Sequence, residues 1–103
     1  MFDKMKQIYE LQKKAKLIKK ELEQIVVNVD ESGGKIKIVI NGELKIQSVF
    51  VDPYFLVPEK KAELENTLKR AISNAIGQAQ QKSAGKMQEM ARDLGLPNIP
   101  GLM

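Results

Sequence analysis

Residues 33–53 read GGKIKIVINGELKIQSVFVDP, and this stretch decides the fold. Apolar side chains recur at every second position on both sides of an Asn-Gly pair, which is the pattern of two half-buried strands joined by a tight turn. The alternating residues are Ile36, Ile38 and Ile40 before the turn, and Leu44, Ile46, Ser48 and Phe50 after it. The stretch therefore predicts an antiparallel hairpin with one buried face, flanked by two long charged segments.

The register of the hairpin can be predicted from the same residues. A two-residue loop at Asn41–Gly42 would set the isoleucines opposite charged side chains, whereas a three-residue loop over residues 40–42 pairs Ile38 with Leu44. In that loop Gly42 takes the left-handed position of a type I turn with a G1 bulge. The sequence therefore predicts a bulged hairpin with the alternating apolar residues on one face.

In this register Val49 and Val51 fall on the opposite face. That face is polar near the turn and becomes apolar at the base of the hairpin, where the two valines lie. A chain of 103 residues is close to the size at which burial only just outweighs chain entropy, so a second copy would add stability. We therefore predict a homodimer joined through the sheet, with Val49 and Val51 at the contact.

The composition removes most kinds of catalysis. The chain has neither His nor Cys, so it lacks the usual general base, a thiol nucleophile and nearly all transition-metal ligands. We expect no enzyme, cofactor, metal site or small-molecule substrate. With no Cys, no apolar signal region and no run long enough to span a bilayer, the sequence predicts a soluble cytoplasmic protein without membrane contact.

Residues 2–24 have the period of an amphipathic helix. Their apolar stripe consists of Ile8, Leu11, Ala15, Ile18, Leu22 and Ile25. On the opposite side Lys6, Lys13 and Lys20 recur every seven residues, with Lys16 beside them and no acid between. A salt-bridge lattice would alternate the signs of charge. This lysine ridge is therefore a candidate phosphate-binding surface, and the alternative is an ordinary solvated face.

The rest of the chain completes an α+β domain. Residues 25–31 predict a first strand, and Pro53 ends the third strand because it removes a ladder donor. A second long helix begins at Pro58 and ends at Gly95, and residues 95–103 are expected to form a flexible tail. The predicted order is helix, three-stranded antiparallel sheet, long helix (α-β-β-β-α), in a single domain over residues 1–103.

Several short segments support a family resemblance when taken together with this order. They are Gly33-Gly34-Lys35, Asn41-Gly42, Val51-Asp52-Pro53, Arg70-Ala71, Asn74-Ala75 and Pro100-Gly101. Over nearly its whole length the chain resembles the YbaB/EbfC family of bacterial nucleoid-associated DNA-binding proteins. The resemblance implies a homodimer joined through the sheet, whose helices project like tweezers and grip duplex DNA with little sequence preference.

The resemblance also implies a location, a role and a set of contact residues. The location is the nucleoid, and the role is nucleoid organisation and gene regulation. Because the family has no fixed basic motif, candidates for phosphate contact are chosen by charge. They are Lys6, Lys13, Lys16 and Lys20 on the first helix, and Lys82, Lys86 and Arg92 near the end of the second.

An alternative function belongs to a different class. A helix, a hairpin and a helix also resemble prefoldin-type subunits, and the heptad spacing between Ile8 and Ile25 agrees with a helical protein-interaction or chaperone-like module without DNA binding. Such arms would need long helices paired continuously over many heptads. Gly77, Gly85 and the short first helix do not favour that arrangement.

Overall fold

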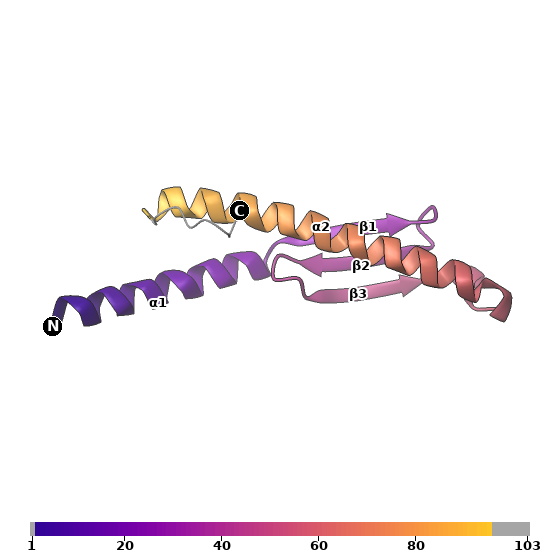
Figure 1. Ribbon diagram of the computed structural model, residues 1–103, viewed down its shortest axis with the longest axis horizontal. Coiled ribbons are helices and arrows are strands. Elements are labelled where there is room, and N and C mark those ends of the chain that lie inside the picture. The colour runs from indigo at the N-terminus through magenta and orange to yellow at the C-terminus, as the bar shows by residue number, and fades with distance from the viewer. Residues whose placement is uncertain (1, 96–103) are drawn as a thin grey trace.

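The computed structural model describes residues 2–95 and has the predicted α-β-β-β-α order (Figure 1). The elements are α1 Phe2–Glu23, β1 Val26–Glu31, β2 Ile36–Asn41, β3 Ile46–Val51 and α2 Lys61–Asp93, with short 3-10 turns at Pro53–Phe55 and Pro58–Lys60. The predicted fold class is thus confirmed. Residues 96–103, which make up nearly all of the predicted tail, lie outside the described residues.

The core lies between one face of the sheet and α2. The antiparallel strands have the order β1-β2-β3, and α2 packs on β1 and β2 (Figure 1). Alanines at every fourth position of α2 bring its backbone close to the sheet, since they add little bulk to the contact. The buried apolar residues are Val27 and Val29 of β1, Ile36, Ile38 and Ile40 of β2, Phe55, and Ala71, Ala75 and Ala79 of α2.

The hairpin between β2 and β3 has the predicted kind of loop at a different place. The turn covers residues 42–44 instead of 40–42, and Leu44 takes the left-handed conformation predicted for Gly42, with a φ of 64°. The backbone N–H of Leu44 donates to the carbonyl of Asn41 at 3.1 Å, and that of Asn41 donates to Lys45 at 3.0 Å. The predicted turn is therefore two residues too early, and the predicted pairing is wrong, since Ile38 pairs with Val49 instead of Leu44.

Asn41 explains this shift. Its side-chain Oδ1 accepts the backbone N–H groups of Glu43 at 2.9 Å and Lys45 at 3.0 Å. These bonds satisfy two donors that the turn leaves without a ladder partner, and they fix the turn after Asn41. The left-handed residue can then be Leu44, because the local hydrogen bonds offset the steric cost of its side chain.

A β-bulge in β3 changes the face of the sheet on which its valines lie. Ile40 pairs with Ile46 but Val39 pairs with Ser48, so Gln47 is the extra residue of a bulge. Beyond the bulge, Val49 pairs with Ile38, whose side chain lies in the core. The prediction that Val49 and Val51 lie opposite the isoleucines is therefore wrong, since directly paired side chains share a face.

The molecule is elongated because α1 projects away from the sheet (Figure 1). Its principal extents are 67 × 18 × 17 Å, and its radius of gyration is 18.8 Å, against about 13 Å for a compact domain of this length. The apolar stripe of α1 is half-buried at Ile18 and Leu22, and Ile25, which follows the helix, is half-buried too. Farther out, Ile8 and Leu11 are exposed.

Candidate nucleic-acid interface

The lysine ridge of α1 is exposed along its whole length. Lys6, Lys13, Lys16 and Lys20 are all exposed on α1. Within residues 2–95 none of the four takes part in an ion pair. Their ammonium groups are therefore available to a polyanion without first breaking a contact inside the protein.

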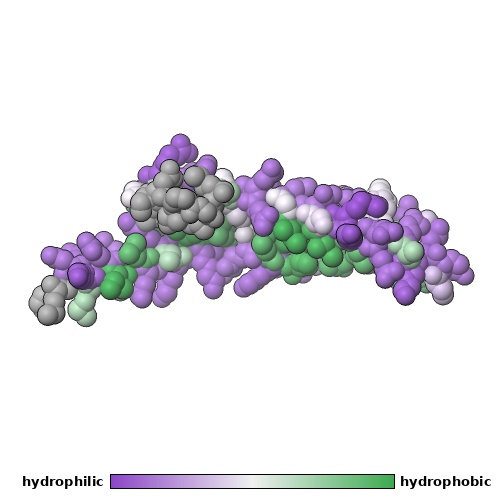
Figure 2. Space-filling model, viewed as in Figure 1, coloured by the Kyte–Doolittle hydropathy of each residue, from purple (hydrophilic) through white to green (hydrophobic). Residues whose placement is uncertain are grey.

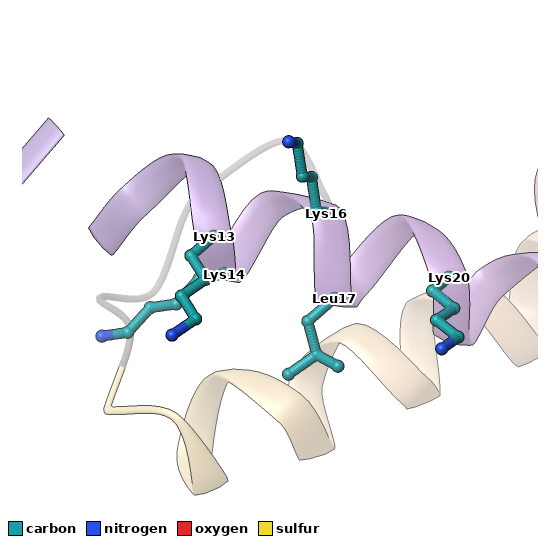
Figure 3. A pocket seen from close by; sticks show the side chains of 5 residues that line it. All are labelled: Lys13, Lys14, Lys16, Leu17 and Lys20. Atoms are coloured by element: carbon teal, nitrogen blue, oxygen red, sulfur yellow. The ribbon is translucent and has the colours of Figure 1, made fainter. Parts of the chain in front are cut away.

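Three of these lysines border a shallow depression on α1. Lys13, Lys16 and Lys20 line it together with Lys14 and Leu17 (Figure 3). In this view Lys13, Lys14 and Lys20 extend toward one side of the helix and Lys16 toward another. The lining of this depression is mostly the apolar surface of Leu17 and of the lysine stems.

Lys14 joins this surface although the charge pattern did not single it out. Its Nζ donates to the backbone carbonyl of Leu94 at 3.2 Å, beyond the last residue of α2. A lysine bound to carbonyls at a helix end also interacts favourably with the helix dipole. Lys14 therefore links α1 to the end of α2. The sequence pattern did not reveal this contact because 80 residues separate Lys14 from Leu94.

The candidates on α2 have different surroundings. Lys82 and Arg92 are exposed, whereas Lys86 is half-buried and pairs with Glu21 of α1, with 3.7 Å between Nζ and Oε2. None of the three borders the depression on α1. We therefore separate Lys86, whose charge is already opposed by a carboxylate, from the unpaired lysines of the ridge.

A second polar surface lies along the outer side of α2. Asn66, Lys69, Arg70, Ser73 and Asn74 line a shallow depression there. Asn74 Nδ2 donates to Glu31 Oε1 at 2.7 Å, and Arg70 Nε lies 4.0 Å from Glu31 Oε2. These contacts hold the middle of α2 to the end of β1, so the two residues that supported the family resemblance have a structural role.

A tyrosine and two lysines meet where β3 leads into α2. Lys60 Nζ donates to the Tyr54 hydroxyl at 2.8 Å and lies 4.5 Å from the ring centre, and Lys35 Nζ lies 5.0 Å from the same centre. The Tyr54 hydroxyl is 3.3 Å from each carboxylate oxygen of Glu63. The hydrogen bond with Tyr54 is the main reason why the pKa of Lys60 is raised above its ordinary value.

Other kinds of site find no support within the described residues. No helix among residues 2–95 is both long and apolar enough to cross a membrane. No group of three or more His, Cys, Asp or Glu side chains in that part of the chain could hold a metal ion.

The geometry is that of a binding protein, in which a small sheet carries two long helices and one helix presents a row of unpaired lysines. Sequence comparison identifies the family of binding proteins to which the chain belongs. The chain matches the YbaB/EbfC DNA-binding family over residues 1–94, and it belongs to that family. The family membership and the DNA-binding function predicted from the sequence are thus confirmed.

Individual relatives agree with this assignment. A nucleoid-associated protein from Dictyoglomus thermophilum is 39% identical over 101 residues, which cover 98% of this chain and 95% of the relative. A nucleoid-associated protein from Rhodopseudomonas palustris is 36% identical over 98 residues, covering 95% and 91% of the two chains. These relatives match at least 95% of this chain and carry the name of nucleoid-associated proteins, so they do not support the prefoldin-like alternative.

A solved structure has the same fold. The crystal structure of an uncharacterized protein from Helicobacter pylori superposes with a TM-score of 0.65 and covers 81% of this chain and 96% of that chain. The sequence identity is 14%, so the likeness concerns the fold alone.

Proposed function

We propose that the protein is a nucleoid-associated protein that binds duplex DNA mainly through the phosphate backbone, with the lysine ridge of α1 as the principal contact. The observation that carries this proposal is that Lys6, Lys13, Lys16 and Lys20 are exposed on a projecting helix and take part in no ion pair within residues 2–95. Lysine is a flexible point charge, suited to phosphates and less suited to the bidentate reading of base edges.

The dimensions of the ridge agree with a backbone contact. Lys6 and Lys20 are 14 residues apart, which is about 21 Å along the helix at 1.5 Å per residue. Duplex DNA presents a phosphate charge every 1.7 Å or so of its axis, so a ridge of this length faces several phosphates at once. Because every sequence offers the same phosphates, binding is expected to show little sequence preference.

The experiment that tests this function is a salt titration. Fluorescence anisotropy of a labelled random-sequence duplex is measured at several salt concentrations, with an unrelated unlabelled duplex as competitor. Contact with Z phosphates gives a log-log slope of about −0.9Z, so four contacts in each protomer give about −3.6 per protomer. A slope near zero, or a competitor that fails to displace the labelled duplex, would rule out backbone recognition.

A homodimer is the second part of the proposal. Because α2 covers only β1 and β2, the edge strand β3 remains exposed, and Val49 is 51% exposed although it lies on the core side of the sheet. Val51 beside it is half-buried. Ile72 and Ile76 of α2 are also partly exposed, and Figure 2 shows a broad apolar area over the sheet next to α2. An uncovered apolar area next to an unpaired strand edge is suited to a second copy.

The dimer is tested by sedimentation. The change Val49→Lys places a charge in the proposed contact and should yield a monomer at micromolar concentration. Val26→Lys is the matched control, because Val26 is 56% exposed on the outer strand β1, away from β3. The unchanged protein and the control should sediment as dimers. A monomeric unchanged protein, or a Val49→Lys variant that remains dimeric, would exclude this contact.

A further inference from the structure

A second shallow depression on α1 adjoins the one that contains Leu17. Its lining consists of Tyr9, Gln12, Lys13 and Lys16. Lys13 and Lys16 also line the depression at Leu17, and they extend to different sides of the helix (Figure 3). The two depressions therefore form one continuous surface, which combines an aromatic ring with two lysines of the ridge.

Tyr9 lies among the lysines of the ridge and not on the apolar stripe of α1. At 3.6 residues per turn it is about 40° around the helix from Lys13, about 20° from Lys16 on the other side, and about 160° from Leu11. Its side chain is 66% exposed. Tyr9 therefore does not continue the packing face of α1, and its ring is open to any ligand that reaches the ridge.

The two tyrosines of the chain differ in their contacts. The Tyr54 hydroxyl contacts Lys60 and Glu63, and its ring packs edge-on against Phe55 with 4.9 Å between the ring centres. Within residues 2–95 the Tyr9 side chain has no hydrogen-bond partner and contacts no other ring or cation. Tyr54 thus has a structural role, whereas Tyr9 has both its ring and its hydroxyl available for a ligand.

An exposed ring between ammonium groups has the chemistry that unpaired nucleotides require. Every base has a flat face that stacks on an aromatic side chain, and positive charges beside the ring hold the backbone. In an intact duplex the neighbouring bases cover these faces, so only the phosphates are offered to the ridge. Tyr9 therefore adds a contact that is available only where bases are unpaired.

The length of this surface agrees with a short single strand. Tyr9 and Leu17 are eight residues apart, which is about 12 Å along the helix. A stacked strand advances about 3.4 Å per nucleotide, so this length corresponds to roughly three or four nucleotides. Lys13 and Lys16 lie between the two ends, and Leu17 is 42% exposed at the second end. One base on Tyr9 therefore brings the next phosphates close to both lysines.

We propose that Tyr9 stacks on an unpaired base while Lys13 and Lys16 contact the adjoining phosphates, so that the protein binds DNA with a short unpaired stretch more tightly than intact duplex. This inference rests on the proposed function of the lysine ridge as the DNA contact. Because stacking on an aromatic ring tolerates every base, the preference is for a structure of DNA and not for a sequence. Intact duplex is still bound through its phosphates, without a contribution from the ring.

Two matched DNA ligands test the preference. Anisotropy at one salt concentration compares a random-sequence duplex with a duplex of equal length in which roughly four central base pairs are mismatched, so that both ligands carry the same number of phosphates. The mismatched duplex should bind at least about fivefold more tightly, the lower limit for one base stacked on an aromatic side chain. Equal affinities would overturn this inference and leave backbone recognition in place. If neither ligand bound, the proposed function would be overturned as well.

Two variants of the full-length protein separate stacking from the greater flexibility of mismatched DNA. Tyr9→Leu keeps an apolar side chain but has no aromatic face, so it should remove the preference and leave the affinity for intact duplex unchanged. Tyr9→Phe is the matched control, because it keeps the ring and should keep the preference. A Tyr9→Leu variant that still preferred the mismatched duplex would assign the preference to flexibility and overturn the stacking contact.

NMR of the tyrosine rings gives a direct measurement. When the mismatched duplex is added to the unchanged protein, the ring current of a stacked base should shift the Tyr9 ring protons upfield. Tyr54 is the internal control, since its ring packs against Phe55 and its protons should not move. Tyr9 protons that did not shift at saturating mismatched duplex would overturn the inference.

Discussion

At the scale of single residues, Gly42 joins three elements. Its N–H donates to the carbonyl of Leu22 at 3.0 Å, and its carbonyl accepts the hydroxyl of Ser83 at 2.6 Å. A Cβ at this position would lie 2.6 Å from the Leu22 carbonyl oxygen. Gly42 is therefore required for the close approach of α1, the hairpin and α2, and not for the left-handed turn that the Asn-Gly pair suggested.

This close approach predicts the effect of a single methyl group. Gly42→Ala should lower the free energy of unfolding by about 1–3 kcal/mol, because the Cβ would push the turn against a backbone oxygen. Gly77→Ala is the control, since its Cβ meets open space and alanine is favoured in a helix by about 1 kcal/mol. Urea denaturation at one fixed protein concentration measures both. A Gly42→Ala variant as stable as the unchanged protein would contradict the described packing.

A second residue-scale prediction concerns Lys60. Its raised pKa means that the charged form is stabilised in the folded protein, so this stabilisation is present below the unfolded value of 10.5 and is lost as pH rises through the folded value. Tyr54→Phe removes the hydroxyl that accepts from Nζ and should shift the pKa of Lys60 back toward 10.5. NMR titration of the Lys60 side chain measures this shift. A pKa that stays raised in the variant would assign it to Glu63 instead.

At the scale of elements, the two long helices are expected to contribute unequally to DNA binding. Lys13→Gln removes an unpaired charge, so the salt slope should decrease in magnitude by about 0.9 for each phosphate that the variant no longer neutralises. Lys86→Gln is matched in chemistry but removes a charge already paired with Glu21. It should change the slope less and the stability by no more than about 1 kcal/mol. Equal changes in slope for both variants would place Lys86 in the DNA contact.

The elements also differ in how far the sequence predicts them. The helices, the burial of the isoleucines and the exposure of the lysine ridge follow from hydrophobic periodicity, which is strong when one face is buried. The pairing register of β3 could not be predicted from hydrophobic periodicity. Because α2 does not cover this edge strand, no strongly buried face distinguishes Ile46 and Phe50 from the valines. The bulge at Gln47 and the capping by Asn41 then decide the register.

Contacts between distant elements were not predictable from the same patterns. The pairing of Lys86 with Glu21 and of Lys14 with Leu94 joins residues that are far apart in sequence, and each involves a long side chain that periodicity marks only as polar. The candidate interface was therefore predictable as a row of exposed charges on one helix. Which of these lysines are paired with a carboxylate could be learned only from the packing of α1 against α2.

At the scale of the whole molecule, the elongated shape and the uncovered sheet edge lead to a prediction that links dimerisation with DNA binding. A dimer joined at β3 presents two lysine ridges to one duplex, whereas a monomer presents one. If both ridges contact phosphates, the salt slope of the dimer is about twice that of the monomer, or about −7 against about −3.6 for four contacts each. Binding through two linked sites is also tighter than through either alone.

The Val49→Lys variant should therefore bind the random-sequence duplex more weakly and with about half the salt slope. Val26→Lys adds the same positive charge at an exposed strand position outside β3, so it should keep the dimer and the full slope. Anisotropy titrations of both variants over one series of salt concentrations measure the difference. If the monomeric variant kept the full slope, a single protomer would make all the phosphate contacts, and the dimer would instead serve to bring two duplexes together.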